Sequence, residues 1–390
     1  MEEIRLLFAG DFCVRYGSLQ HLQPEKMAEI AAPIRALTAK YDASVVNVET
    51  VFTDICEPVK KSGPCLHSPE AALQLLQNMG FTIGAMANNH VCDQGYDIGL
   101  RSKELVRGIG MQTMGYGKNL QEASVPVRIT AKGKRISFFN FAEHEFEAAT
   151  DTTPGFAPLH AYRCGQLVME EKKTADYVFV MLHAGSEYCP FPRRGVRDLS
   201  YHLIDSGADG VIIAHPHCPT GIETYQEKPI AYSLGNFYMC KSSQAVSLWN
   251  FGYMADICIS ADGAISLTSI PYQFGAEGEF LQLLEGDRKR DFLAYLQKLS
   301  DLVSKTPDAQ YQRLLEAWSL IIWEEYEVYY KDFMVDMSHD GQWCLLIKNL
   351  FTCESHIEAM QNYLLLHTKN RTHLYEEEKA YIRQLQSFIV

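Results

Sequence analysis

The stretch Thr82–Gly95, TIGAMANNHVCDQG, decides the fold of this chain. It opens with the apolar segment Thr82–Ala87, which we expect to form a short buried strand, and runs directly into Asn88, Asn89 and His90. An α/β sheet places its ligand sites outside the carboxyl ends of its strands. The alternative is a polar turn in which Asn and His only cap the helix that follows.

Four other apolar segments end on polar side chains in the same way. These segments are Ile4–Ala9, Ala43–Val48, Asp176–Leu182 and Gly210–Ala214, and they lead to Gly10-Asp11, Asn47 with Glu49, His183, and His215-Pro216-His217. A lone acidic residue at such a position is usually a helix cap or a solvated loop carboxylate. The repetition over five segments favours a single shared site.

The pair His215 and His217 is the most specific of these signals. In extended backbone, residues two apart lie on one face, so both imidazoles are expected on the same side of the chain. Imidazoles at that separation suit neighbouring metal sites. Core histidines rarely occur as such a pair after an apolar strand, which favours metal ligands.

The order of elements predicts an α/β layered fold followed by a helical region. Helical patterns, such as Pro24–Tyr41 and Ser68–Met79, alternate with buried strands through most of the chain. The composition changes over residues 275–286, where we place a boundary between a domain of residues 1–275 and a helical region of residues 286–390. Aromatic residues at helical spacing in that region predict core packing or a homodimer contact through the C-terminal helices.

Composition excludes several classes of function. The net charge of −13 over 390 residues argues against nucleic acid as a partner, because phosphate backbones select basic surfaces. Eleven cysteines without a CxxC pair predict free thiols in a reducing compartment. No apolar run approaches the roughly 20 residues of a membrane span, and a strand expected from Ile4 leaves no room for a signal peptide. We therefore expect a cytoplasmic protein.

The residues collected at the strand ends predict a metal site. They comprise carboxylates, amides and imidazoles: Asp11, Asn47, Glu49, Asn89, His90, His183, His215 and His217. This donor set suits two borderline divalent ions such as Mn, Fe or Zn, which would activate a water molecule between them. His144, between two glutamates, is expected to be an exposed loop residue. The cations nearest these motifs are Lys60, Lys61, Arg193 and Arg194, which would bind an anion or, for the lysines, serve solubility alone.

The order of these ligands resembles that of the calcineurin-like metallophosphoesterases. Within that superfamily, the motifs resemble the CapA-type poly-γ-glutamate capsule biosynthesis family over about residues 4–272. They are Gly10-Asp11, NVE (Asn47–Glu49), NNHVCDQG (Asn88–Gly95), HAGSEY (His183–Tyr188), HPHCPTGIE (His215–Glu223) and SLGNF (Ser233–Phe237). Two positions depart from the pattern: Cys13 replaces the histidine of the usual Asp-x-His, and Ala184 stands where Trp is common. Typical members of the family are secreted or membrane-anchored.

The resemblance implies a four-layer α/β/β/α sandwich and a role for each residue. Asp11 and His217 would hold one ion, Asn89, His183 and His215 the other, and Glu49 would bridge them. His90 would be the catalytic residue, as a general acid or as a stabiliser of developing negative charge. Apart from the resemblance, we expect substrate binding by Asn47, Asp93, Glu187 and Asn236, with Lys60, Lys61, Arg193 and Arg194.

Three functions are compatible with such a site. The first is a metal-dependent hydrolase of an anionic substrate, such as a γ-glutamyl amide or related polymer. The second is a phosphodiesterase or phosphomonoesterase, because a fold does not fix its chemistry. The third is a non-catalytic module that binds poly-γ-glutamate or a similar anionic partner.

Overall fold

The computed structural model describes residues 2–335 and 341–390. Its strands are β1 (Ile4–Cys13), β2 (Ala43–Val48), β3 (Ile83–Ala85), β4 (Gln112–Met114), β5 (Tyr116–Gly117), β6 (Val127–Ala131), β7 (Lys134–Ala142), β8 (Gly155–Phe156), β9 (Tyr177–His183), β10 (Gly210–Ala214), β11 (Ile222–Tyr225), β12 (Lys228–Ala231), β13 (Asn236–Met239), β14 (Phe251–Ile259), β15 (Ile265–Phe274) and β16 (Leu281–Leu283). Its helices are η1 (Tyr16–His21), α1 (Pro24–Thr38), α2 (Ala72–Met79), α3 (Tyr96–Gly108), α4 (Leu120–Ala123), α5 (Ala161–Lys172), α6 (Arg194–Asp205), η2 (Leu248–Asn250), α7 (Gly286–Lys305), α8 (Asp308–Val335), α9 (Gly341–Thr352), α10 (Glu354–Thr368) and α11 (Glu376–Gln386).

Two mixed sheets form the centre of the molecule. The first has the strand order β16-β15-β14-β1-β2-β3-β4, with β13 also paired to β1, and the second has the order β11-β12-β10-β9-β7-β6. Strands β1, β2, β3 and β4 run parallel, as do β7, β9, β10 and β12. Parallel strands bring their carboxyl ends to one edge, so the polar segments that follow them can converge.

The sheets pack face to face, and helices cover both outer surfaces. In β1, Leu7 joins the apolar cluster under α1, α2 and α3, whereas Phe8 joins the cluster between the sheets and contacts Phe138 and Phe179. On the far side of the second sheet, Val180 packs against α5 and α6. Each full burial of such a side chain contributes about 1.5–3 kcal/mol. The fold is the expected four-layer α/β/β/α sandwich.

The Gly10-Asp11 motif lies inside a strand, whereas the sequence analysis ended this strand at Ala9. Strand β1 continues to Cys13, and its pairing with β2 shifts register between Ala9 and Asp11. Gly10 lies inside this bulged strand, where a Cβ atom would come within 1.8 Å of the carbonyl oxygen of Gly235. The glycine is therefore required by close approach of two backbones, and the bulge turns Asp11 toward the site.

Three segments differ from the predictions. The helix expected from Ser68 begins at Ala72, because Ser68 instead forms an isolated bridge with Phe52. The expected boundary at residues 275–286 contains β16, which pairs with β15 as an edge strand of the first sheet. Helix α9 was not predicted. The division into two domains stays a prediction.

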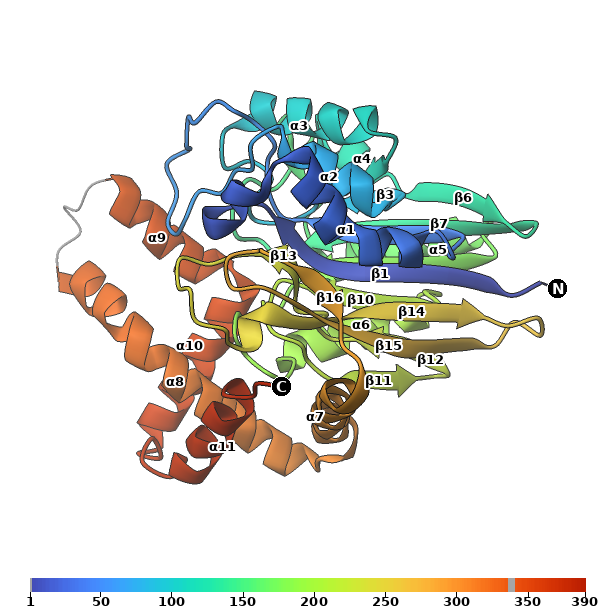
Figure 1. Cartoon of the computed structure of the whole chain (residues 1–390). Helices are drawn as coiled ribbons and strands as arrows, with labels where there is room; N and C mark the ends of the chain where they lie inside the picture. Colours follow the sequence, from blue (N-terminus) through green and yellow to red (C-terminus); the bar gives the residue numbers. More distant parts are fainter. Residues whose placement is uncertain (1, 336–340) are drawn as a thin grey trace.

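The C-terminal helices lie at one end of the sandwich. Figure 1 shows α8, α9 and α10 across the end toward which β1 runs, far from the N-terminus. Helix α7 packs beside β11 and β15, and Phe292 enters the cluster between the sheets. Trp318 and Tyr311 of α8 pack with Phe191 of the sandwich in a separate apolar cluster. The C-terminal region is thus joined to the sandwich through apolar contacts.

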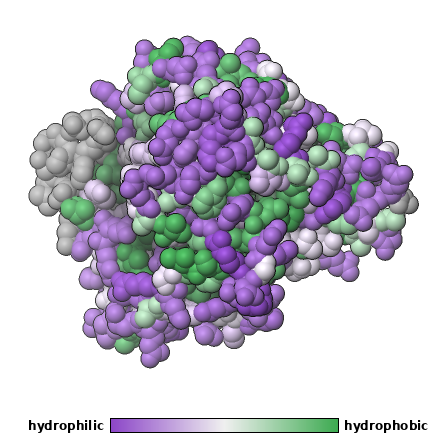
Figure 2. All heavy atoms as spheres, in the orientation of Figure 1, coloured by the Kyte–Doolittle hydropathy of each residue, from purple (hydrophilic) through white to green (hydrophobic). Residues whose placement is uncertain are grey.

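The surface agrees with the acidic, polar composition. Figure 2 shows hydrophilic residues over most of this face, with hydrophobic residues gathered near its centre. Across residues 2–335 and 341–390, every helix is too short or too polar to traverse a lipid bilayer.

Candidate metal centre

The predicted residues converge where the two sheets meet. Asp11 and Glu49 come from β1 and the end of β2 in the first sheet, and Asn89 and His90 follow β3. From the second sheet, His183 ends β9, and the His215–His217 segment follows β10. All of these side chains are buried. The polar turn after β3 does not serve as a helix cap, because α3 begins at Tyr96 and its N-cap residue is Gly95, which provides no side-chain cap.

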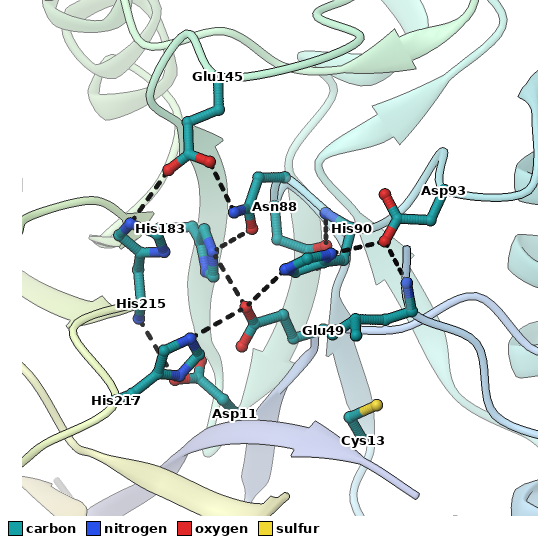
Figure 3. A network of polar contacts seen from close by, with 12 residues as sticks. Asp11, Cys13, Glu49, Asn88, His90, Asp93, Glu145, His183, His215 and His217 are labelled. Carbon is teal, nitrogen blue, oxygen red and sulfur yellow. Dashed lines mark hydrogen bonds and ion pairs between the residues drawn. The ribbon is translucent and has the colours of Figure 1, made fainter. Parts of the chain in front are cut away.

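Glu49 lies at the centre of this cluster. Its Oε1 atom is 3.8 Å from Nε2 of His90, 3.6 Å from Nε2 of His183 and 3.7 Å from Nε2 of His217. Figure 3 shows the three rings directed toward the carboxylate. Neither carboxylate oxygen has a hydrogen-bond partner among the described residues, although the side chain is fully buried.

These unpartnered oxygens fit a cation. Burial, followed by the charge of Asp11, raises the pKa of Glu49 well above its usual value. A buried carboxylate without partners is costly, and a metal ion would satisfy both oxygens. The donors fall into two groups that share Glu49: one with His215 and His217, the other with Asp11 and His183. This sharing fits the expected bridging role. Nδ1 of His217 also lies 3.4 Å from Oδ2 of Asp11, the pair expected to hold one ion, and the assignment of ligands to each ion stays a prediction.

Asn47 connects the two sheets. Its Nδ2 atom donates to Oδ1 of Asp11 at 2.7 Å and lies 3.2 Å from Nδ1 of His183. The amide therefore fixes a ligand from each sheet, and its position explains why Asn stands two residues before Glu49. Asn47 acts on the site by positioning other side chains.

The His215–His217 segment is not the extended backbone that the pattern predicted. Its two histidines have φ values of 105° and 56°, in a region that residues with side chains rarely adopt. The reason is that β10 ends at Ala214 and the chain turns immediately. Strain of this kind persists at functional sites, where the surroundings hold it. His217 is held through its Nδ1 atom, 2.9 Å from Oδ1 of Asn236.

Glu145 is a site residue that the sequence reasoning missed. Its Oε2 atom accepts from Nδ2 of Asn89 at 2.7 Å, and its Oε1 atom is 3.1 Å from Nε2 of His215. Burial would lower the pKa of His215, but Glu145 outweighs it and raises the value to about 9. Glu145 follows β7 as the other candidates follow their strands, so the same strand-end signal could have found it.

His90 belongs to a buried hydrogen-bonded network. Its Nδ1 atom contacts Oδ2 of Asp93 at 2.6 Å and Nζ of Lys61 at 3.3 Å. Lys61 also forms an ion pair with Asp93 and donates to the backbone oxygen of Asn89 at 3.0 Å. Burial, followed by the charge of Lys61, lowers the pKa of His90. Asp93 is therefore a positioning residue, and Nε2 of His90 faces the cluster.

The basic residues separate into two sets. Lys61 and Glu187 line the cavity beside the cluster, as expected for substrate-binding residues. Arg15 lines it as well, and the sequence analysis did not identify this residue. Lys60 is exposed elsewhere. Arg193, expected to bind substrate, is buried in ion pairs with Glu143 and Glu358, the latter at 2.9 Å.

Two further expectations need correction. Arg194 pairs at 3.5 Å with Asp308 at the start of α8 instead of lining the cavity. His144 is half-buried, not exposed, and its Nδ1 atom lies 2.6 Å from Oε1 of Glu354. Both are contacts with the C-terminal helices, which sequence spacing does not reveal.

A cavity of about 330 Å³ opens above the cluster. His90, His215 and His217 line it from the sandwich, and Trp318 of α8 and His356 of α10 line it from the C-terminal helices. This size lies at the lower end of the range for small-molecule sites. The C-terminal region is therefore part of the candidate site, although the sequence showed no chemistry there.

Comparisons with known proteins identify proteins that are similar to this chain. A family model described as bacterial capsule synthesis protein PGA_cap matches residues 5–241. The PGA biosynthesis protein CapA of Bacillus subtilis is 32% identical over 180 residues, which are 44% of this chain and 46% of that protein. The capsule biosynthesis protein CapA of Bacillus anthracis is 28% identical over 179 residues, with 44% and 43% covered. The chain thus spans a little under half the length of these relatives.

Among solved structures, the chain is similar to the NAD nucleotidase of Haemophilus influenzae. The TM-score is 0.45 at 13% identity, over 76% of this chain and 62% of that one. A 5'-nucleotidase from Candida albicans gives 0.43 at 11% identity, with 71% and 52% covered.

The family model covers the motifs of the first three strand ends, His183 and the His215–His217 segment, and it spans more than half of the chain. This chain belongs to the bacterial capsule synthesis protein family PGA_cap.

Proposed function

We propose that this protein is a metal-dependent hydrolase of an anionic substrate. The substrate is a γ-glutamyl amide or a related polymer, and the bond cleaved is its amide bond. The observation that carries the proposal is the buried carboxylate of Glu49, which has two unpartnered oxygens and three imidazoles directed toward it. The family name and the relatives named for poly-γ-glutamate synthesis support the substrate class.

Two divalent ions, Mn, Fe or Zn, would be held by Asp11, Glu49, Asn89, His183, His215 and His217. When bound, such ions supply Lewis-acid activation of water and neutralise negative charge in the transition state. The ligands fit because they combine hard oxygens with imidazoles. Asn47, Glu145 and Asn236 would keep these ligands oriented through the hydrogen bonds described above.

His90 would handle the proton transfer. Because Asp93 binds Nδ1, the proton exchanged with the substrate is the one at Nε2. From that position the ring could protonate the leaving group or stabilise developing negative charge. Arg15 would attract the anionic substrate locally, against a chain whose net charge is −13, and Lys61, whose charge is balanced by Asp93, lines the cavity beside it.

A panel of substrates tests the proposal. The protein is stripped with a chelator, reloaded separately with Mn, Fe and Zn, and assayed on γ-glutamyl peptides and on nitrophenyl phosphates. We expect metal-dependent release of glutamate, and no release after His215→Ala with His217→Ala. The matched control, His202→Ala with His373→Ala, removes two histidines outside the site. Turnover of phosphates alone would identify a phosphoesterase, which Lys61 and Arg15 would also suit.

Metal bound without any turnover would favour a non-catalytic module that binds poly-γ-glutamate. A homodimer through the C-terminal helices is a separate proposal, checked by the mass of the protein in solution.

A further inference from the structure

A second cavity, of about 500 Å³, adjoins the one above the metal ligands. Six residues line both cavities: Tyr188, His217, Trp249, Trp318, Ile322 and Glu325. Some of these belong to the sandwich and the others to α8, so the two cavities are neighbouring parts of one cleft between them. Because His217 is a candidate metal ligand, a substrate held at the metal centre has room to extend from there into the second cavity.

Two parallel strands bring one cation to each cavity. Strands β1 and β13 pair with Cys13 beside Met239, and Arg15 and Lys241 each follow their strand by two residues. Arg15 lines the first cavity and Lys241 lines the second. The Nε atom of Arg15 donates to the backbone oxygen of Cys240 at 2.9 Å, which ties the two segments together. The two cations therefore lie at the same edge of the first sheet.

Trp249 links Lys241 to the metal centre. Nζ of Lys241 lies 5.7 Å from the centroid of the Trp249 ring, and the centroid of the His217 ring lies 4.7 Å from that of Trp249. Asn236, whose Oδ1 atom holds His217, also donates through Nδ2 to the backbone oxygen of Trp249 at 3.2 Å. The lysine, the tryptophan and the candidate ligand thus form one connected group.

Neither cation has a carboxylate partner among residues 2–335 and 341–390. Lys241 is half-buried, and its ammonium group donates to the hydroxyl of Ser247 at 2.9 Å. Burial lowers the pKa of Lys241, and no carboxylate opposes this effect. A half-buried ammonium group without a counter-ion is stabilised when an anion binds to it.

The other charges of the cleft leave this wall favourable for an anion. In the second cavity, Arg383 is offset by Glu324, 3.6 Å away. The carboxylates of Glu187 and Glu325 line the first cavity, and Glu325 also lines the second. Both are exposed, so solvent and salt screen them more strongly than the half-buried Lys241.

We infer that Arg15, Trp249 and Lys241 form an anion-binding strip for the part of the substrate beyond the reacting bond, with Lys241 holding a carboxylate of a neighbouring unit. The preferred substrate is then an oligomer that carries an anionic group on each unit. A γ-glutamyl chain has this character, because every unit keeps its α-carboxylate. The inference rests on the proposed function and deepens it by adding a second subsite.

The test compares two probes on the full-length, Mn-loaded protein: γ-glutamyl-glutamate and the γ-linked tetramer. Affinity is measured by rapid-mixing tryptophan fluorescence, before appreciable turnover, because Trp249 and Trp318 line both cavities. We expect the tetramer to bind about tenfold tighter than the dipeptide. Lys241→Met should bring the two affinities close to each other, whereas Lys241→Arg, which keeps the charge, should retain the preference.

Lys298→Met is the matched control. Nζ of Lys298 also lies over an aromatic ring, 5.0 Å from the centroid of Tyr381, but this lysine lines neither cavity. The control removes the same charge and should leave the preference intact. Equal affinities for the two probes in wild type, a preference that survives Lys241→Met, or no binding of either probe would overturn the inference.

Binding is read separately from turnover, so the inference and the proposed function can fail independently. A preference for the tetramer that depends on Lys241, without hydrolysis of either probe, would support the strip and count against the proposed hydrolase. Hydrolysis of both probes with equal affinities would do the reverse.

Discussion

The Nδ1 atom of His90 lies 2.6 Å from Oδ2 of Asp93, and both side chains are buried. Asp93 also accepts from the backbone nitrogen of Leu66 and pairs with Lys61, so the carboxylate is fixed from three sides. A carboxylate held in this way sets the orientation and tautomer of the imidazole it binds. The second ring nitrogen of His90, Nε2, is thereby directed at the candidate metal ligand Glu49.

His90→Ala should lower kcat by about 10²–10⁴, because it removes a group that acts in the transition state. Metal content and KM should change little, since other residues supply the ligands and the anion contacts. Steady-state kinetics and elemental analysis check this, with His202→Ala as the control. A variant that lost its metal would show that His90 is a ligand instead.

Glu49→Gln should have different effects on the metal-free and metal-loaded protein. In the metal-free chain, burial favours the neutral form of Glu49, so an amide of the same shape should change the free energy of unfolding by less than about 1 kcal/mol. With metal at 100 times its dissociation constant, wild type gains about 2.7 kcal/mol, and the variant should lose that gain. Urea unfolding with and without Mn measures both effects. A variant stabilised by metal as strongly as wild type would exclude Glu49 as a ligand.

Arg193→Ala should destabilise the protein by about 3–5 kcal/mol, because it leaves the buried Glu143 and the partner Glu358 without their cation. Arg194→Ala is the neighbouring control. Among the described residues, the Arg194 guanidinium pairs with the exposed Asp308 and lies 5.8 Å from the centroid of the Tyr311 ring, so its loss should cost about 1 kcal/mol or less. Urea unfolding gives the magnitudes, and hydrogen exchange shows whether α10 is released first. Equal costs for the two variants would contradict the buried pairing.

The contact between His144 and Glu354 should make docking of α10 depend on pH. The hydrogen bond that His144 donates to Glu354 raises the pKa of His144. Burial would raise the pKa of Glu354, but His144 outweighs it and lowers that pKa. The histidine contribution is complete below about pH 6.5 and is lost as pH rises through its folded pKa. The glutamate contribution is present above about pH 4.3 and is lost as pH falls through its folded pKa.

The two contributions therefore overlap between about pH 4.3 and 6.5, where the contact is strongest. His144→Gln in the metal-free protein should be less stable than wild type in this window, and the difference should decline above it. Positive charge on nearby His160, whose Nε2 atom is 3.2 Å from Nε2 of His144, opposes the effect at the acidic end. A difference in stability that is constant from pH 5 to pH 9 would sink the prediction.

Much of the sandwich could be predicted from the sequence because its strands are short, apolar and bounded by clear turn residues. The strands Ala43–Val48 and Gly210–Ala214 have the predicted bounds. The ligands that directly follow a strand could be predicted, because parallel strands bring their carboxyl ends together. Glu145 obeys the same rule, since it follows the apolar end of β7, but the sequence analysis considered only the neighbouring His144 in this loop.

Other features depend on contacts that local sequence does not encode. His144 binds Glu354, which is 210 positions away, and Arg193 binds Glu358, which is 165 positions away. Arg193 was expected at the substrate because its loop follows a ligand strand, but burial beside Glu143 gives its charge a structural use. The cavity wall from α8, α9 and α10 arises in the same way, from packing between distant segments.

Asp11 and His215 lie on different sheets and are 204 positions apart in the chain. Cys13 and Cys218, which lie near these two segments in the sequence, are free thiols, so they form no disulfide between these regions. An ion coordinated from both sheets would act as a reversible cross-link that closes a very long loop of the chain. Cross-links of long loops restrict the unfolded ensemble most strongly in the chain-entropy view. Metal supply would then govern how long the folded protein survives, as disulfide formation does for secreted domains.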